Sequence, residues 1–214
     1  MSHTMTALSA ALPLVSGWSV HSLWMRRRIE TARRDPLTGL WTRDPFEERA
    51  RKSLSRGSQC AVLVLDLNRF KEINDTLGHA AGDAVIRTTG QRLGRWAEEH
   101  AGIAGRLGGD EFAAVIPGYS IDKLRVDLFM LTGRIDQPVP FGGRPIEVRA
   151  SIGAAYYRTG PGELSTLLRR ADEQMYKAKQ LGGGWRVAHR LTVPETLTVN
   201  GRRDGRRGTS GKAA

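Results

Sequence analysis

Several stretches of the chain show the apolar patterns of β-strands. The run QCAVLVLD (Gln59–Asp66) is continuously apolar and ends in a carboxylate, which predicts a buried central strand. Two further runs, GIAGRL and EFAAVI, are separated only by Gly-Gly-Asp, and this arrangement predicts a β-hairpin. We expect another strand at PIEVRASIGAAYY, after the turn FGGRP, and a short last strand at WRVAH.

Other segments have the spacing of apolar residues that is typical of helices. TRDPFEERARKSLS predicts a helix with Asp44 as the N-cap, Pro45 at the first helical position and Glu47 at the capping-box position. The stretch from Arg69 to His100 predicts a short helix, a turn bounded by glycine and a longer helix. The apolar face of the longer helix carries Val85, Ile86, Leu93 and Trp96. Helices are also expected at SIDKLRVDLFMLTGRI and GELSTLLRRADEQMYKAKQ.

The irregular alternation of these elements, with one hairpin among them, predicts an α+β fold. We expect an α/β sandwich in which helices pack on a mixed, mostly antiparallel sheet. The chain has 214 residues, and its elements lie within residues 35–190, which predicts one domain there. Past Arg190 the pattern stops, so residues 191–214 are expected to be a disordered basic tail.

The net charge of +11 is concentrated near the two ends of the chain. Arg26–Arg34 carries +4 and Asn200–Ala214 carries another +4, which leaves +3 for the rest. A nucleic-acid groove usually carries its charge on the folded body. We therefore expect no specific nucleic-acid partner.

Residues 1–34 are expected to form a separate N-terminal segment. Residues 7–25 contain no formal charge and are followed at once by three arginines, whereas no Lys or Arg precedes them. This arrangement argues against a secretory signal peptide and predicts a single span of the cell membrane with the following domain in the cytoplasm. Pro13, His21 and four serines weaken the span. The alternative is an amphipathic or coiled-coil stalk in a cytoplasmic protein.

The segment GRLGGDEFAAVIPG places two carboxylates directly after two glycines. Gly108 and Gly109 permit a tight turn with positive φ, so Asp110 and Glu111 should project from the rim of the hairpin. Asp66 ends the other strong strand. If the two strands are neighbours, three carboxylates converge there and repel one another unless a cation lies among them.

Oxygen ligands of this kind suit Mg²⁺ or Mn²⁺, and Mg²⁺ often completes its coordination with substrate phosphates. The single cysteine, Cys60, excludes a thiolate-rich metal site and an internal disulfide. The pattern therefore indicates metal-assisted phosphoryl transfer. A solvated acidic turn is the alternative.

Five segments resemble, in order, the motifs of the GGDEF family, the bacterial diguanylate cyclases of signalling pathways. They are DPLTGLWTR (Asp35–Arg43), DLNRFKEINDTLGHAAGD (Asp66–Asp83), GGDEF (Gly108–Phe112), SIGAA (Ser151–Ala155) and ADEQMYKAK (Ala171–Lys179). The resemblance implies a fold like that of the nucleotidyl cyclases and the polymerase palm. It also implies that two GTP molecules condense to cyclic di-GMP and two pyrophosphates. Because one domain of the family holds one GTP, it further implies a homodimer.

The resemblance implies a metal site and a base. Asp66, the main-chain carbonyl of Leu67 and Asp110 correspond to ligands of Mg²⁺ or Mn²⁺. Glu111 corresponds to the base that takes the proton of the attacking 3′-hydroxyl, and also to a contact of a second metal ion.

The resemblance also implies how GTP is bound. Phe70 and Lys71 lie in the loop whose backbone amides hold the phosphates, and Lys179 corresponds to a phosphate-binding lysine. A solvated lysine late in a helix is the alternative for Lys179. Asn74 and Asp83 correspond to the pair that reads guanine, whose N1–H and 2-amino group one carboxylate accepts together. A turn residue and a helix cap starting at Ala84 are the alternatives for these two.

Three departures from the family pattern stand out. Gly182–Gly184 replaces the frequent Gly-Arg-Asn, so a phosphate contact is missing unless Arg186 supplies it. Glu99–Gly102 has neither the Arg nor the Asp of the inhibitory RxxD element, and Asn68 stands where members often have Asp. A regulatory module that binds GTP or cyclic di-GMP without turnover is the alternative function, but such members usually have altered signature residues.

Overall fold

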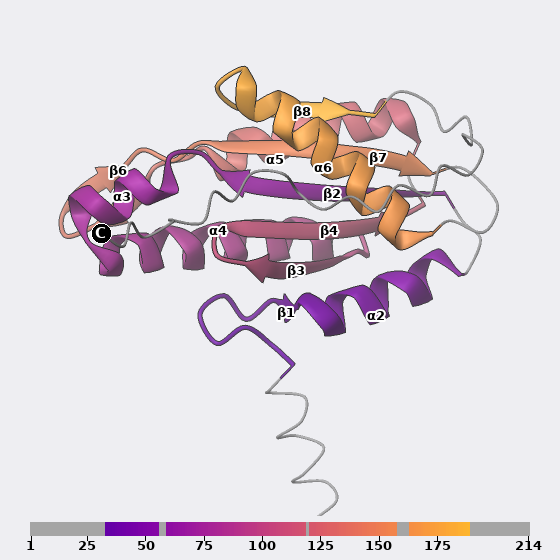
Figure 1. Ribbon diagram of the computed structural model, residues 1–214, viewed down its shortest axis with the longest axis horizontal. Helices are drawn as coiled ribbons and strands as arrows, with labels where there is room; N and C mark the ends of the chain where they lie inside the picture. The colour runs from indigo at the N-terminus through magenta and orange to yellow at the C-terminus, as the bar shows by residue number, and fades with distance from the viewer. Residues whose placement is uncertain (1–32, 56–58, 119, 158–162, 189–214) are drawn as a thin grey trace, which may run out of the picture.

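The computed structural model describes residues 33–55, 59–118, 120–157 and 163–188. Its centre is a six-stranded sheet with the order β1-β3-β4-β2-β7-β8 (Figure 1). The strands are β1 (Trp41–Thr42), β2 (Cys60–Leu67), β3 (Ile103–Gly108), β4 (Glu111–Pro117), β7 (Ala150–Tyr157) and β8 (Gly184–Val187). The four central strands are antiparallel to one another, whereas the short outer strands β1 and β8 run parallel to their neighbours. The predicted mixed, mainly antiparallel sheet is confirmed.

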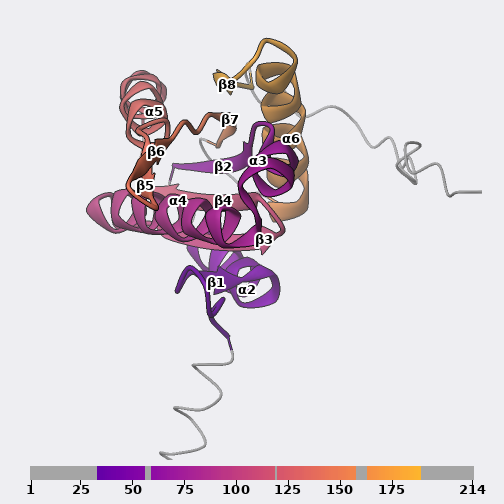
Figure 2. The ribbon, with the colours of Figure 1, turned by 90° about the vertical axis from the view of Figure 1, so that its left-hand side faces the viewer.

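Helices cover both faces of this sheet. α4 (His79–Glu99) and α5 (Ile121–Ile135) pack on one face, and α2 (Arg43–Leu54) and α6 (Leu164–Gln180) pack on the other (Figure 2). The short α3 (Phe70–Leu77) connects the end of β2 to α4. The buried residues of α4 include Val85, Ile86, Leu93 and Trp96, as its apolar face predicts. The α+β class is therefore confirmed.

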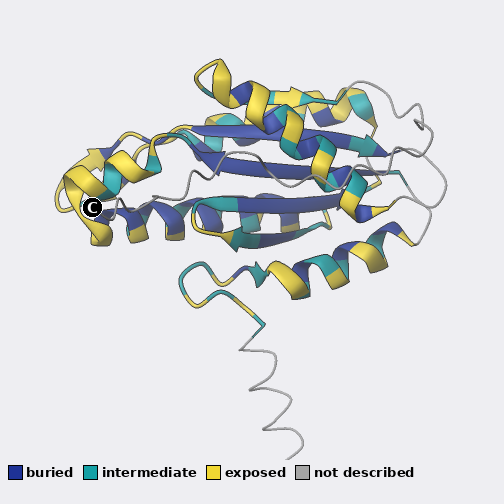
Figure 3. Cartoon of the chain, viewed as in Figure 1, coloured by how far each residue is buried: buried dark blue, intermediate teal, exposed yellow. Residues whose placement is uncertain are grey.

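The alternation of side chains along β2 divides them between two cores. The odd-numbered residues from Ala61 to Leu67 enter the core under α4 and α5, and the even-numbered residues from Cys60 to Val64 enter the core under α2 and α6. All eight residues of β2 are buried (Figure 3). Asp66 continues the even-numbered set, and this periodicity directs its side chain toward α6.

Two helix starts differ from the prediction. α2 begins at Arg43 with Thr42 at the N-cap position, so Asp44 lies in the first turn instead of capping the helix. There its negative charge still interacts favourably with the positive end of the helix dipole. α4 begins at His79, because Gly78 adopts a φ of 83° and turns the chain directly from α3 into α4. Asp83 therefore lies inside α4, and its alternative interpretation as the cap of a helix starting at Ala84 is wrong.

The single strand predicted over Pro145–Tyr157 is divided in two. β6 (Arg144–Ile146) pairs with β5 (Val139–Phe141) in a separate hairpin, closed by Gly142 and Gly143 with φ values of 55° and 78°. The segment between β6 and β7 turns Val148 into the core, where it is 2% exposed. This inward turn interrupts the sheet ladder between the two strands.

A membrane span and a basic tail were predicted at the two ends of the chain. Among the helices of the described ranges, none combines the length and the apolar composition that a membrane span requires. The predicted span at residues 7–25 and the tail at residues 191–214 lie outside those ranges.

Candidate active site

The hairpin between β3 and β4 brings its carboxylates to the end of β2. Asp66 is directly opposite Glu111 in the antiparallel register of β2 and β4. The backbone amide of Leu67 donates to the carbonyl of Asp110 over 3.4 Å. Gly108 and Gly109 form the turn with φ values of 149° and 51°, both in the region that favours glycine. The neighbouring strands that the sequence interpretation required are therefore present.

The side chain of Asp66 is buried and is near charges of both signs. It is 11% exposed, and the Nζ of Lys179 lies 2.5 Å from its Oδ1. Burial raises the pKa of Asp66, the ion pair with Lys179 lowers it, and the negative charges of Asp110 and Glu111 raise it further, with a net increase. One protein cation thus offsets the buried charge incompletely, and the site favours an additional cation.

The donor atoms at this position suit a hard divalent ion. Within the described ranges, no three side chains of His, Cys, Asp and Glu come together closely enough to hold a metal by themselves. The cross-strand neighbours Asp66 and Glu111, with the adjacent carbonyl of Leu67, form a smaller set of oxygens. Mg²⁺ is commonly held by one or two carboxylates together with water and substrate phosphates, so this set fits it.

The predicted phosphate loop follows directly after Leu67. Arg69 adopts the left-handed conformation with φ of 58°, and α3 begins at the next residue, Phe70. The backbone amides of Glu72 and Ile73 donate to the carbonyl of Arg69. The amides of Phe70 and Lys71 are in the first turn, where a helix offers no carbonyl partner. They are therefore donors without a helical acceptor, at the positive end of α3 and a few residues after Asp66 in the chain.

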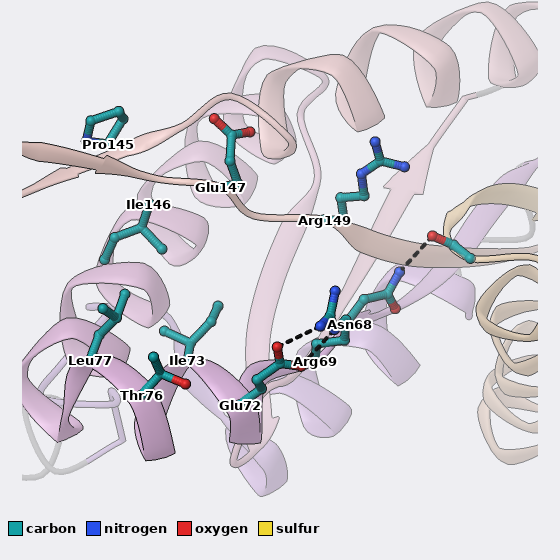
Figure 4. A pocket seen from close by; sticks show the side chains of 11 residues that line it. Asn68, Arg69, Glu72, Ile73, Thr76, Leu77, Pro145, Ile146, Glu147 and Arg149 are labelled. Atoms are coloured by element: carbon teal, nitrogen blue, oxygen red, sulfur yellow. Dashed lines mark hydrogen bonds and ion pairs between the residues drawn. The ribbon is translucent and has the colours of Figure 1, made fainter.

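Asn68 anchors this loop to two other parts of the chain. Its Oδ1 accepts a hydrogen bond of 2.8 Å from the hydroxyl of Ser151 in β7, and its Nδ2 donates over 3.3 Å to the carbonyl of Gly182 (Figure 4). Its backbone amide donates to the carbonyl of Arg149 over 2.8 Å. In the sequence, Asn68 stands out only as a departure from the family pattern, because its partners are distant in the chain.

A cleft of about 700 Å³ opens beside Asn68, between α3 and β6 (Figure 4). Ile73, Leu77 and Ile146 line one end, and Arg69 and Arg149 line the other. Neither of the proposed guanine-reading residues is part of this lining. The cleft therefore adjoins the phosphate loop without containing the predicted guanine pocket.

The two residues predicted to read guanine lie on adjoining helices. A Cβ added to Gly82 of α4 would stand 2.0 Å from Oδ1 of Asn74, so the side chain of Asn74 in α3 rests on Gly82. Asp83 is the next residue of α4 and is exposed. The absence of a side chain at position 82 thus permits the close approach of the two helices beside Asp83.

An ion pair that sequence reasoning missed connects the first motif to the hairpin. Nη1 of Arg106 lies 3.1 Å from Oδ2 of Asp35, and Nε and Nη2 of Arg106 donate to the carbonyl of Gly109 over 3.0 and 2.8 Å. Burial would raise the pKa of Asp35, but hydrogen bonds from Thr38 and Arg106 outweigh it and lower that pKa. Arg106 therefore fixes the hairpin turn to the segment that precedes the sheet.

Arg43 adds a second link on the outer side of the hairpin. Its Nε donates to the carbonyl of Leu107 over 3.1 Å, and its Nη2 lies 3.8 Å from Oε2 of Glu111. Glu111 thus has a cation nearby that also contacts β3. The motif that contains Asp35 and Arg43 was recognised in the sequence, but neither contact was predicted.

The glycine triplet after α6 stands where the family often has Gly-Arg-Asn, and it has a structural role. Gly182, Gly183 and Gly184 have φ values of 90°, 125° and 87°. A Cβ at Gly183 would lie 2.9 Å from Nδ2 of Asn68 and 3.2 Å from the carbonyl of Ala150. Arg186 lines a hollow with Arg125 and Leu181 whose lining contains none of the site carboxylates.

The fold and this site define a nucleotidyl-cyclase-like domain, and comparisons with known proteins specify the family. The family model described as "Diguanylate cyclase, GGDEF domain" matches residues 32–184. An uncharacterised 19.3 kDa protein of Streptomyces ambofaciens is 45% identical over 169 residues, which cover 78% of this chain and 89% of that protein. The chain belongs to the GGDEF family.

Two further similar proteins have a name or title that says what the protein does or binds. Diguanylate cyclase DgcP of Pseudomonas aeruginosa is 36% identical over 154 residues, which cover 69% of this chain and 22% of that protein. The crystal structure of the coiled coil and GGDEF domain of DgcB from Caulobacter crescentus, in complex with c-di-GMP, matches with a TM-score of 0.73 and 27% identity. That match covers 86% of this chain and 98% of the DgcB chain. The chain spans less than a quarter of DgcP, which therefore contains a large part without a counterpart here.

Proposed function

We propose that this protein is a diguanylate cyclase that condenses two GTP molecules into cyclic di-GMP. In each half of the reaction, a 3′-hydroxyl oxygen bonds to the α-phosphorus of the other GTP, and the bond from that phosphorus to pyrophosphate breaks. The observation that carries the proposal is the direct opposition of Asp66 and Glu111 beside the Asp110 turn, with Lys179 bound to Asp66. Membership of the GGDEF family and the named diguanylate cyclase relatives support it.

Asp66 and Glu111, with the carbonyl of Leu67, would hold Mg²⁺ or Mn²⁺, and Asp110 at the adjoining turn is assigned as a further ligand that joins this pair only when the ion is bound. When bound, the metal offsets triphosphate charge and lowers the pKa of the attacking hydroxyl. Glu111 accepts the proton of the 3′-hydroxyl. The guanidinium of Arg43, 3.8 Å from Oε2 of Glu111, helps to keep this carboxylate at the hairpin rim.

The phosphates are bound by groups from two elements. The amides of Phe70 and Lys71 receive phosphate oxygens at the start of α3, and the ammonium of Lys179 approaches from α6. Lys179 contacts Asp66 in the structure described here. With GTP present, the same ammonium is close enough to the carboxylate site to donate to a phosphate oxygen as well, since Lys has three donors.

The preference for guanine is assigned to Asn74 and Asp83. Asp83 accepts from N1–H and the 2-amino group of guanine, a pair of donors that adenine lacks. The contact of Asn74 with Gly82 supports a shared role, because it places the amide beside the helix position that precedes Asp83.

The ring product requires two half-sites, so the active form is a homodimer whose two GTP-loaded sites face each other. Residues 1–32, which are most of the N-terminal segment predicted at residues 1–34, are proposed to hold the two chains together, either through paired membrane spans or through a short two-helix stalk. In both arrangements residues 35–190 form the catalytic domain and lie in the cytoplasm with their substrate.

Product analysis of the full chain with GTP and Mg²⁺ tests the proposal. Asp110→Asn removes one metal ligand at a half-exposed turn, so synthesis should fall by more than about 100-fold, because metal ions supply several kcal/mol of charge stabilisation. Asp122→Asn, at the exposed start of α5, is the matched control and should retain activity. Pyrophosphate release and cyclic di-GMP are measured, with circular dichroism as the check on folding. Normal turnover by a folded Asp110→Asn protein would refute the site assignment.

A further inference from the structure

α5 is apolar on two opposite faces. Leu124, Leu128, Leu131 and Ile135 enter the core and are fully buried. On the other side, Val126, Phe129 and Met130 follow the spacing i, i+3, i+4 and are 62%, 68% and 63% exposed. The charged residues of α5, such as Arg125 and Arg134, leave these three apolar side chains together on its outer side, and an exposed apolar patch of this kind commonly marks a contact surface. The outer stripe of α5 therefore lacks the cover that its composition indicates.

This stripe borders one of two hollows that adjoin β8. One, of about 720 Å³, is lined by Phe129 and Met130 of α5 and by Trp185 of β8. The other, of about 330 Å³, shares Trp185 and adds Leu181 and Val187. We call this surface, formed by Phe129, Met130, Leu181, Trp185 and Val187, the α5–β8 groove. Leu181, which directly follows α6, is 68% exposed, so the groove presents apolar side chains from α5, from β8 and from the end of α6.

The chain leaves the described structure from the wall of this groove. β8 is the last strand at its edge of the sheet, and the amide of Ala188 still donates to Ala154 of β7 over 2.8 Å (Figure 1). The described chain therefore ends at Ala188, next to Val187. Its other end, at Arg33, lies near β1 at the opposite edge of the sheet, five strand spacings or about 24 Å away.

The composition of the following residues matches the groove. Residues 191–199 read LTVPETLTV, with apolar side chains at Leu191, Val193, Leu197 and Val199, whereas the basic residues of the tail begin after Asn200. The single charge of this segment is Glu195. Arg125 and Arg186 line the smaller hollow, so the groove offers cations to that one carboxylate.

We propose that residues 191–199 of the same chain dock along the α5–β8 groove and cover the outer stripe of α5. Nine extended residues reach about 30 Å, which exceeds the length of about 22 Å expected for the fifteen residues of α5. The covalent connection at β8 keeps the segment at a high effective concentration beside the groove. This docking divides the tail, so that residues 200–214 alone form its basic part. It does not depend on the proposed enzymatic activity.

Methyl NMR of methionine-labelled protein tests the docking directly. Met130 lies in the groove, whereas Met175 is 6% exposed in the core under α6 and serves as an internal reference. Deleting residues 190–214 should shift the Met130 methyl signal and leave that of Met175 in place. Deleting residues 200–214 is the matched control and should leave both signals as in the full chain.

Paired substitutions in the full chain separate docking from simple shortening. Val193→Asp with Leu197→Asp should reproduce the Met130 shift of the 190–214 deletion. Thr192→Asp with Thr198→Asp adds the same charge at neighbouring polar positions. This pair should shift the Met130 methyl signal much less. Spectra are recorded at two protein concentrations. An unchanged Met130 signal after deletion of residues 190–214 overturns the proposal. A Met130 signal that depends on concentration also overturns it, because a second copy then covers the groove.

Discussion

The surroundings of Asp66 both favour and disfavour the negative charge of its carboxylate. Its burial and the neighbouring carboxylates disfavour its charge, and only the ion pair with Lys179 favours it. A protein selected for stability alone would gain by replacing such a carboxylate, because an incompletely offset buried charge costs free energy. Its presence beside Glu111 is therefore best explained by the proposed metal and phosphate chemistry.

A substitution of Asp83 tests how the protein selects GTP over ATP. Asp83→Ala should reduce the preference for GTP over ATP in kcat/KM by about 10- to 100-fold, because a lost paired contact with guanine corresponds to ~1–3 kcal/mol. Asp75→Ala, in the exposed part of α3, is the matched control. Competition assays with both nucleotides give the ratio. An unchanged ratio in Asp83→Ala would remove this residue from the guanine site.

Asn68 allows a test of how the phosphate loop is positioned. Asn68→Asp keeps an acceptor for Ser151 but turns a carboxylate oxygen toward the carbonyl of Gly182, in place of the present donor. We expect KM for GTP to rise by about tenfold, since a lost hydrogen bond and the new repulsion cost roughly 1–1.5 kcal/mol. The change in kcat should be smaller.

Ser151→Ala serves as the comparison for Asn68→Asp. It removes the hydroxyl that donates to Oδ1 and keeps the contact of Nδ2 with Gly182, so KM should rise less. If Asn68→Asp and the unaltered protein share the same KM, the contact with Gly182 does not position the loop.

At the scale of elements, the β3–β4 hairpin is attached on its outer side to the segment before the sheet. Arg106 joins the hairpin turn to Asp35, and Arg43 of α2 joins β3 to Glu111. The carboxylates of the turn are thereby fixed by contacts that strand pairing alone does not supply. A change in the segment around Asp35 is therefore expected to reach the hairpin.

Asp35→Asn tests the energetic part of this connection. The folded protein lowers the pKa of Asp35 below its ordinary value of 3.8, so the ionised carboxylate stabilises the fold above that value. This stability is lost as the pH falls through the lower folded pKa. Asp35→Asn should therefore be less stable by about 1–3 kcal/mol at pH 7, and its difference from the unaltered protein should narrow toward pH 3.

Urea unfolding at pH 7, 5 and 3 measures this difference. Asp122→Asn controls for the loss of a carboxylate at an exposed helix start. A gap between Asp35→Asn and the unaltered protein that stays constant over this pH range would show that the ion pair with Arg106 does not stabilise the fold.

At the scale of the whole molecule, the proposed reaction needs two domains, and their encounter depends on a tether. Deleting residues 1–32 should leave a folded domain that binds GTP and whose specific activity rises steeply with protein concentration. The deletion ends at residue 32 because Arg33 and Arg34 belong to the domain: Nη1 of Arg34 donates to Gly39 over 2.7 Å, and Arg33 pairs with Glu48.

A parallel coiled coil fused in place of residues 1–32 should restore activity at low concentration. Analytical ultracentrifugation of both proteins relates activity to dimer content. Full activity of the truncated domain at nanomolar concentration would show that residues 1–32 do not assemble the dimer.

Much of the fold was predictable because local patterns report local structure. The continuous apolar run of β2 and the glycine turn between β3 and β4 were identified from neighbouring residues alone. The helix starts at Arg43 and His79 were missed, because the N-cap residues Thr42 and Gly78 make no side-chain capping hydrogen bond and the starts are set by the backbone. The division of β6 from β7 was missed because Val148 belongs to the same core as residues of α4 and α5, which are distant from it in the chain.

By itself, the sequence determined the order of the elements, the α+β class and the residue types of the candidate site, since these follow from periodicity and from motifs in series. The tertiary structure alone decided which of those residues meet. Lys179 and Asp66 are 113 positions apart, and Arg106 and Asp35 are 71 apart. Such pairs depend on strand order, on register and on the face to which each side chain points. A one-residue shift along β2 would turn Asp66 away from α6, although every local pattern would remain the same.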